Sequence, residues 1–121
     1  MSPKTQLPVF ALTCVLAMSG TVHAGFIDGH KLKELSDAHA RIESGSERRS
    51  DAMEKAFYTG FVAGVQDSVE DILICSPKDV TTGQMTAIVR KYIQANPEKW
   101  SSTGATLVTE ALSVAFPCKG K

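Results

Sequence analysis

The sequence has no surplus of charge of either sign. Its 13 lysines and arginines balance 13 aspartates and glutamates, so the formal net charge is zero. A protein that binds nucleic acid usually carries a basic excess that neutralises phosphates, and no run of like charges occurs along this chain. Nucleic acid is therefore not an expected partner.

The sequence also lacks the residue patterns of an enzyme. It has no phosphate-cradling glycine loop, and its carboxylates are scattered among lysines and arginines, as on a solvated helical surface. Two of its histidines, His30 and His39, lie nine positions apart in one predicted helix, which places them on opposed faces. They cannot easily share a metal ion. We therefore expect a binding protein that uses no metal or cofactor, rather than an enzyme.

Long apolar runs are absent except near the amino terminus. There, residues 9–18 are mostly apolar and follow Lys4, which supplies the short positive segment at the start of a signal peptide. The small or compact residues of Val22-His23-Ala24 then suit cleavage before Gly25. We predict that residues 1–24 are a cleaved secretory signal peptide and that residues 25–121 form the exported domain. Since a membrane span needs about 20 apolar residues, no span is expected after cleavage. A retained membrane anchor is the alternative.

Cysteine is scarce, with three in the whole chain. Cys14 lies in the predicted signal peptide, which leaves Cys75 and Cys118 in the exported domain. In an oxidising compartment two cysteines most simply pair with each other, and a loop of this length would stabilise the fold by about 4 kcal/mol in the chain-entropy model. The alternative is that Cys75 is a free catalytic thiol, although no histidine lies near it in sequence.

Apolar residues recur at three- and four-residue steps, and no segment alternates convincingly as a strand would. We therefore predict an all-α, compact, bundle-like domain of about four helices. The first runs from about Asp28 to Glu43 and the second from Ser50 or Asp51 to about Ile74. The third begins at the capping box Thr81–Gln84 and ends at or before Asn96. The fourth begins near Ser102 or Thr103 and ends before Pro117.

The second predicted helix contains two glycines in its interior. Gly60 and Gly64 lie beside the face expected to enter the core, and each costs about 1 kcal/mol relative to alanine in a helix interior. This cost favours a groove in which a neighbouring helix approaches closely; a ligand cleft at the glycines is the alternative. The residues expected on the core face are Met53, Phe57, Phe61, Val65, Ser68 and Ile72.

The other predicted helices show simpler apolar stripes. In the third helix, Val80 and Met85 also stand where a hydrophobic staple would form. The expected core-facing residues of the first, third and fourth helices are Leu32, Leu35, His39 and Ile42; Met85, Ile88, Val89, Tyr92 and Ile93; and Leu107, Val108, Ala111, Leu112 and Ala115.

A polar connection between the third and fourth helices contains Trp100, the only tryptophan of the chain. Aromatic residues in loops often anchor protein interfaces. The alternative is that Trp100 folds back onto the edge of the bundle. The candidate partner-binding residues are Glu98, Lys99, Trp100, Ser101, Ser102 and Thr103.

The order of several short motifs over about residues 27–118 resembles the Rap/Tai-type immunity proteins, which protect bacteria from type VI secretion amidase effectors. The motifs are Tyr58-Thr59-Gly60-Phe61-Val62-Ala63-Gly64-Val65, Cys75-Ser76-Pro77, Val80-Thr81-Thr82-Gly83-Gln84, Tyr92 to Pro97 and Ala111-Leu112-Ser113-Val114-Ala115-Phe116-Pro117-Cys118. One departure is that Ser36 and Tyr58 stand where many members have an additional cysteine pair, so the first helix would be held less firmly.

The resemblance implies an all-α periplasmic homodimer that binds a peptidoglycan amidase delivered by neighbouring cells. A protruding loop would enter and block the active-site cleft of the amidase, and that role maps onto Glu98 to Thr103. The alternative function is a small disulfide-bonded periplasmic chaperone or stress protein. The balance of acidic and basic residues does not mark the chain as an acid-activated chaperone.

The predicted disulfide can be tested on the exported protein. Because Cys75 and Cys118 pair, alkylation under denaturing, non-reducing conditions should modify neither, and reduction should lower the melting temperature clearly. Mass spectrometry of the alkylated protein checks the first point. Two alkylated thiols would contradict the pairing.

Overall fold

Four α-helices and one short 3₁₀ turn make up the part of the chain that the computed structural model describes, residues 26–120. The predicted signal peptide, residues 1–24, lies outside the described residues. This part of the chain contains no extended strand, and the predicted all-α class is confirmed. The elements are α1 Gly29–Glu43, α2 Asp51–Val69, α3 Thr82–Ala95, η1 Pro97–Lys99 and α4 Gly104–Ala115.

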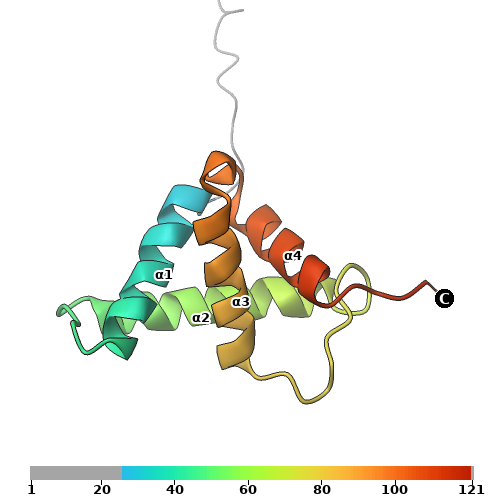
Figure 1. Ribbon diagram of the computed structural model, residues 1–121, viewed down its shortest axis with the longest axis horizontal. Helices are drawn as coiled ribbons and strands as arrows, with labels where there is room; N and C mark the ends of the chain where they lie inside the picture. Colours follow the sequence, from blue (N-terminus) through green and yellow to red (C-terminus); the bar gives the residue numbers. More distant parts are fainter. Residues whose placement is uncertain (1–25, 121) are drawn as a thin grey trace, which may run out of the picture.

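The longest helix, α2, runs across the molecule (Figure 1). A short loop joins the end of α1 to the start of α2. The helix α4 ends near the other end of α2, and α3 crosses between α1 and α4. Among residues 26–120 no helix is both long and apolar enough to cross a bilayer.

Helix starts follow the local sequence closely. The Asp28 carboxylate accepts a hydrogen bond from the Lys31 amide and caps α1. The capping box of α3 is present, with Thr81 Oγ1 accepting from the Gln84 amide and Gln84 Oε1 accepting from the Thr81 amide. Both contacts satisfy amides that a helix leaves free in its first turn. The predicted starts of α1 and α3 are therefore confirmed.

The core lies where the four helices meet. In α1, α3 and α4 it uses the predicted stripes, with Leu32, Val89 and Leu107 fully buried. Ala115 differs from expectation: it is exposed at the last residue of α4. The buried apolar residues are Ile27, Leu32, Leu35, Ala38, Tyr58, Val62, Ile74, Met85, Val89, Ile93, Leu107, Val108, Ala111 and Leu112.

The predicted core face of α2 is only partly correct: Phe61 and Val65 pack against the core, but the other four predicted residues are exposed. Tyr58 and Val62 are fully buried, whereas Met53 is 80% exposed and Phe57 is 56% exposed. The reason is geometric: each four-residue step advances about 40° around a helix, so a series of such steps spirals from one face to another. The series that begins at Met53 starts on the solvent side and reaches the half-buried Phe61 after two steps and Val65 after three.

The glycines of α2 do not accommodate a neighbouring helix of the same chain, contrary to expectation. A Cβ atom added at Gly60 or Gly64 would meet no described atom within 4 Å, and both glycines are exposed. Close packing occurs instead at the first residues of α1 and α4. A Cβ on Gly29 would lie 2.6 Å from the Cα of Trp100, and one on Gly104 would lie 3.1 Å from the Ile27 carbonyl oxygen.

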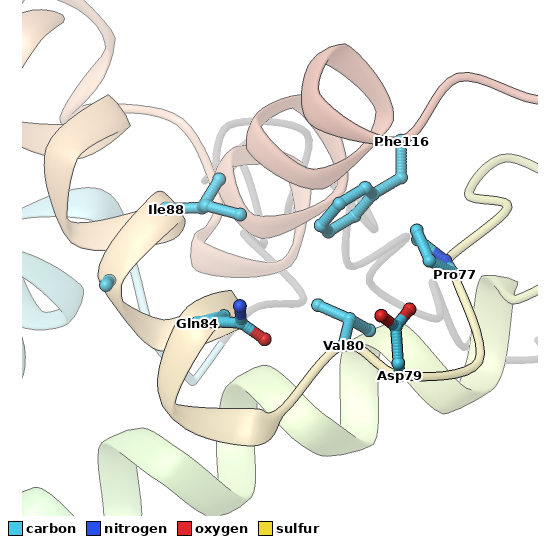
Figure 2. Close-up of a pocket in the computed structure, with 7 residues that line it drawn as sticks. Pro77, Asp79, Val80, Gln84, Ile88 and Phe116 are labelled. Carbon is cyan, nitrogen blue, oxygen red and sulfur yellow. The ribbon is translucent and has the colours of Figure 1, made fainter.

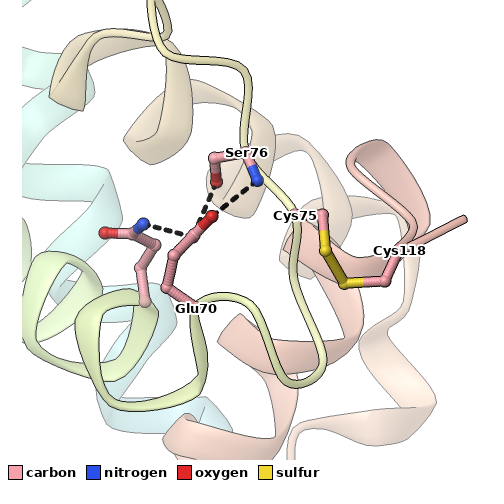
Figure 3. Close-up of a disulfide and its surroundings, with 5 residues drawn as sticks. Glu70, Cys75, Ser76 and Cys118 are labelled. Atoms are coloured by element: carbon pink, nitrogen blue, oxygen red, sulfur yellow. Dashed lines mark hydrogen bonds between the residues drawn. A yellow bond between two sulfur atoms is a disulfide. The ribbon is translucent and has the colours of Figure 1, made fainter. Parts of the chain in front are cut away.

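Helix α2 ends at Val69, five residues before the predicted end. The chain then turns sharply, with a positive φ of 60° at Asp71, and brings Ile74 back into the core. The Glu70 carboxylate holds this turn by accepting from the amide and hydroxyl of Ser76 and from the Gln66 side chain (Figure 3). Burial opposes ionisation of Glu70, but these hydrogen bonds outweigh it and lower its pKa.

The predicted disulfide is present between Cys75 and Cys118 (Figure 3). Next to it, the Cys75 amide donates to the Phe116 carbonyl oxygen at 2.9 Å. The two contacts join the segment that follows α2 to the segment that follows α4.

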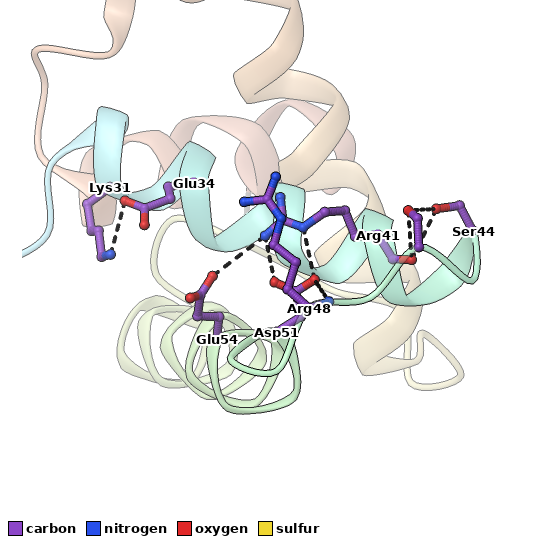
Figure 4. Close-up of polar contacts among 8 residues, drawn as sticks. Lys31, Glu34, Arg41, Ser44, Arg48, Asp51 and Glu54 are labelled. Atoms are coloured by element: carbon purple, nitrogen blue, oxygen red, sulfur yellow. Dashed lines mark hydrogen bonds and ion pairs between the residues drawn. The ribbon is translucent and has the colours of Figure 1, made fainter.

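The opposite end of α2 is held to α1 by an ion pair. The Arg41 guanidinium donates to both carboxylate oxygens of Asp51 at 2.9 and 2.6 Å, and the Arg48 amide donates to Asp51 as well (Figure 4). The Asp51 side chain is fully shielded from solvent. Two parallel bonds from one guanidinium fix both distance and orientation, so this pair sets how α1 approaches α2.

The Asp51 contacts predict a pH-dependent stability. The hydrogen bond from Arg41 lowers the pKa of Asp51 to about 2, against an unfolded value of about 3.9. A lowered pKa stabilises the fold fully above the unfolded pKa, and this stabilisation is lost as pH falls from about 4 to about 2. Asp51→Asn should therefore be less stable than the wild type at pH 7, with the difference shrinking over that range.

Chemical denaturation at a series of pH values checks this expectation. Asp67→Asn is the matched control, because Asp67 is an exposed carboxylate on the same helix. A difference between Asp51→Asn and the wild type that stays constant from pH 7 to pH 2 would contradict the assignment.

Candidate functional site

The connection between α3 and α4, residues 96–103, is tied to the start of α1. The Trp100 carbonyl oxygen accepts from the His30 amide at 3.2 Å, and the Ser102 carbonyl oxygen accepts from the Gly29 amide at 2.9 Å. The first amides of a helix are free and carry partial positive charge, so they hold carbonyl groups well. The loop is therefore fixed by backbone contacts as well as by side chains.

The Trp100 side chain lies half-buried against the core. Its Nε1–H donates to the Ile93 carbonyl oxygen at 2.9 Å. The ring meets His30 edge to face, and Lys33 Nζ lies 5.4 Å from the ring centroid. Of the two alternatives left open by the sequence, this geometry is that of a tryptophan folded onto the edge of the bundle.

Lys99 is also engaged within the domain. Its Nζ donates to Tyr92 Oη at 2.8 Å and to Glu110 Oε2 at 2.9 Å, and the Tyr92 hydroxyl donates to the same Glu110 oxygen at 2.8 Å. The bonds to Tyr92 and Glu110 raise the pKa of Lys99, and the bonds from Lys99 and Tyr92 lower the pKa of Glu110. The cluster joins the loop to α3 and α4.

The remaining candidate residues face outward to different degrees. Glu98 and Ser101 are exposed, and Ser102 is half-buried. Thr103 is exposed too, but its hydroxyl accepts from the Thr106 amide and caps α4. The loop thus presents one carboxylate and one free hydroxyl on a backbone that is already ordered, which suits hydrogen bonding to a partner protein.

Sequence reasoning missed three residues that shape this loop: Gly29, Tyr92 and Glu110. Gly29 lets the backbone at Trp100 approach α1, where a Cβ would lie only 2.7 Å from the Trp100 carbonyl oxygen. A glycine at the first position of a predicted helix was the available signal. The partnership of Tyr92 with Glu110 joins two helices, so no local spacing could reveal it.

A separate hollow of about 490 Å³ lies beside the disulfide-linked end of the domain (Figure 2). Val80, Ile88 and Phe116 line it with apolar surface, and the Asp79 carboxylate stands at its edge. The candidate loop contributes no residue to this hollow.

Within residues 26–120 no three side chains of His, Cys, Asp or Glu gather closely enough to hold a metal ion. The chain matches the family model of the Rap1a immunity proteins over residues 28–118. A comparison with curated proteins found no match.

The position of Trp100 predicts a stability effect. Trp100→Ala should destabilise the domain by about 2 kcal/mol, because it removes a half-buried ring and its hydrogen bond to Ile93. Trp100→Phe retains an aromatic ring and should cost about 1 kcal/mol, chiefly for the lost indole hydrogen bond, because the Ile93 carbonyl oxygen still accepts from the Asn96 amide. Chemical denaturation of both variants checks the order. Equal stability of Trp100→Ala and the wild type would mean that the ring lies free in solution.

Proposed function

Because the chain belongs to the Rap1a immunity proteins, we propose that it protects its producer by binding and inhibiting a peptidoglycan amidase effector of a type VI secretion system. The binding blocks the active-site cleft of the amidase. It takes place in the periplasm, to which the predicted signal peptide, residues 1–24, directs the protein. The protein acts there as a homodimer and not as an enzyme.

The single observation that carries this proposal is the family match over residues 28–118, nearly the whole described domain. An immunity protein of this family neutralises a secreted effector. The amidase target, the periplasmic site and the homodimer rest on the resemblance of the helix and cysteine motifs to the Rap/Tai-type proteins.

The loop at residues 96–103 supports the proposed mode of action. A protein segment that enters an enzyme cleft binds more tightly when it is ordered beforehand, because less conformational freedom is lost on binding. The α1 amides, the Trp100 contacts and the Lys99–Glu110 pair supply that order.

The exposure and bonding of the side chains support a division of roles within this loop. Glu98 and Ser101 are exposed and make the contacts with the amidase. Lys99 and Trp100 hold the loop in shape through bonds to Glu110 and Ile93. Ser102 and Thr103 complete the loop, Ser102 through its carbonyl bond to α1 and Thr103 as the cap of α4.

The test uses the purified protein and a Cys-His amidase encoded beside its gene. The wild-type protein should bind and inhibit this enzyme. Glu98→Ala should weaken binding about tenfold, or ~1.4 kcal/mol, because an exposed contact is lost while the loop keeps its internal bonds. Isothermal titration calorimetry gives the dissociation constant.

Glu47→Ala is the matched control, since Glu47 is an exposed carboxylate in the loop between α1 and α2. It should leave the dissociation constant unchanged. Equal binding by Glu98→Ala and Glu47→Ala would contradict the loop assignment. Failure of the wild type to bind or inhibit such an amidase would contradict the proposed function.

A further inference from the structure

One side of α2 is not covered by any helix of the described domain. We call it the outer face of α2; it consists of Met53, Ala56, Phe57, Gly60 and Gly64. All five residues are exposed, with Met53 at 80% and Phe57 at 56%. The helices α1, α3 and α4 pack on the other side, against Tyr58 and Val62.

The two glycines at the centre of this face make no close packing contact within the described part of the chain. Neither has positive φ, and a Cβ on either would meet no described atom within 4 Å. Glycine is nonetheless a poor helix former. Two glycines spaced by four residues remove side chains from one strip of a helix and let another helix approach its backbone closely.

We propose that the outer face of α2 binds the same face of a second copy of this chain, with the two α2 helices antiparallel and crossing at Gly60 and Gly64. This inference rests on the homodimer proposed above and names its interface, which the family match does not assign.

Shape supports an antiparallel pair of identical helices. The first half of the outer face carries the bulky Met53 and Phe57, and the second half is lined by Gly64 and the exposed Asp67 and Ser68, which are smaller. Antiparallel pairing places the bulky half of each copy over the small half of the other. A parallel pair would instead bring Phe57 against Phe57 and leave the small halves unfilled. A two-fold axis also makes the contact close on itself, so that it yields a dimer rather than a filament.

Charge favours the same arrangement. Arg48 and Arg49 precede α2 and are exposed, and with the exposed Glu47 beside them they leave this end net positive, whereas the exposed charges at the other end are Asp67 and Asp71. Antiparallel pairing brings the basic end of each helix toward the acidic end of its partner. Parallel pairing would bring like charges together, which disfavours association.

The extent of the face suits a modest interface. A helix of 19 residues is about 28 Å long, and the turn after α2 adds the exposed Ile72 and Leu73, which are 71% and 51% exposed. Stable interfaces bury roughly 1,200 to 2,000 Å² in total. A dimer built on one helix pair lies near the lower limit, so its dissociation should be measurable by dilution.

The experiment compares the wild-type protein, purified as the producing cell processes it, with the double variant Gly60→Leu/Gly64→Leu. Sedimentation velocity over a concentration series should show a dimer for the wild type. The double variant should dissociate at a concentration at least tenfold higher, because the new side chains separate the two backbones. Its monomer should keep its helix content and melt no lower than the wild-type monomer, since both positions are open to solvent.

Gly83→Leu is the matched control, because Gly83 is an exposed glycine in α3, and a Cβ there would meet only the Thr81 hydroxyl oxygen at 3.8 Å. It should leave dimerisation unchanged. A second variant, Phe57→Glu, should weaken the dimer without glycine replacement and so confirms the face independently.

Three outcomes would overturn the inference. A wild type that is monomeric at its highest soluble concentration excludes the dimer, whereas amidase binding is measured separately and can still stand. A dimer unaffected by the glycine and Phe57 variants places the interface elsewhere. If the wild type is monomeric and the double variant no longer binds the amidase, the outer face of α2 binds the effector instead.

Discussion

The arrangement of this domain depends on Tyr58, a fully buried tyrosine near the middle of α2. Its hydroxyl donates to the Thr86 carbonyl oxygen of α3 at 2.8 Å, and its ring meets His39 of α1 edge to face. Burial raises the pKa of Tyr58, so the side chain stays a neutral donor. One residue thereby sets the rotation of α2 about its own axis, because every other residue of a helix follows at about 100° per step.

That rotation determines which side of α2 is buried and which side is exposed. With Tyr58 and Val62 turned inward, Met53, Phe57, Gly60 and Gly64 must face outward. The ends of the helix are then held by different chemistry. Asp51 is bound by Arg41 at the start, and the turn after Val69 is held by Glu70 and by the disulfide that follows. The Asp51–Arg41 pair joins α2 to α1, and the Glu70 contacts and the disulfide hold the segment that follows α2. The outer face therefore lies on a helix that is fixed at both ends.

The candidate loop is rigid for a related reason. It lies where α1 begins, and the free amides of that helix bind its carbonyl groups. Trp100 and Lys99 are directed inward by bonds to Ile93 and Glu110, which leaves Glu98 and Ser101 as the exposed groups. An ordered loop with few exposed side chains offers a partner its shape and a small number of hydrogen bonds.

The sequence by itself determined the features that arise from neighbouring residues. The helix starts at Asp28 and Thr81 come from side chains that bond to amides three positions away, and the break before Pro97 comes from the ring of proline. The pairing of Cys75 with Cys118 followed from the small number of cysteines. Only the tertiary structure decided the buried side of α2, the early end of α2 at Val69 and the inward turn of Trp100. These depend on contacts among residues far apart in sequence, and a pattern of four-residue steps drifts around a helix and cannot select one face. The glycines show the same limit: their spacing indicated a close approach, but only the packing of the other helices showed that it is not made within the described part of the chain.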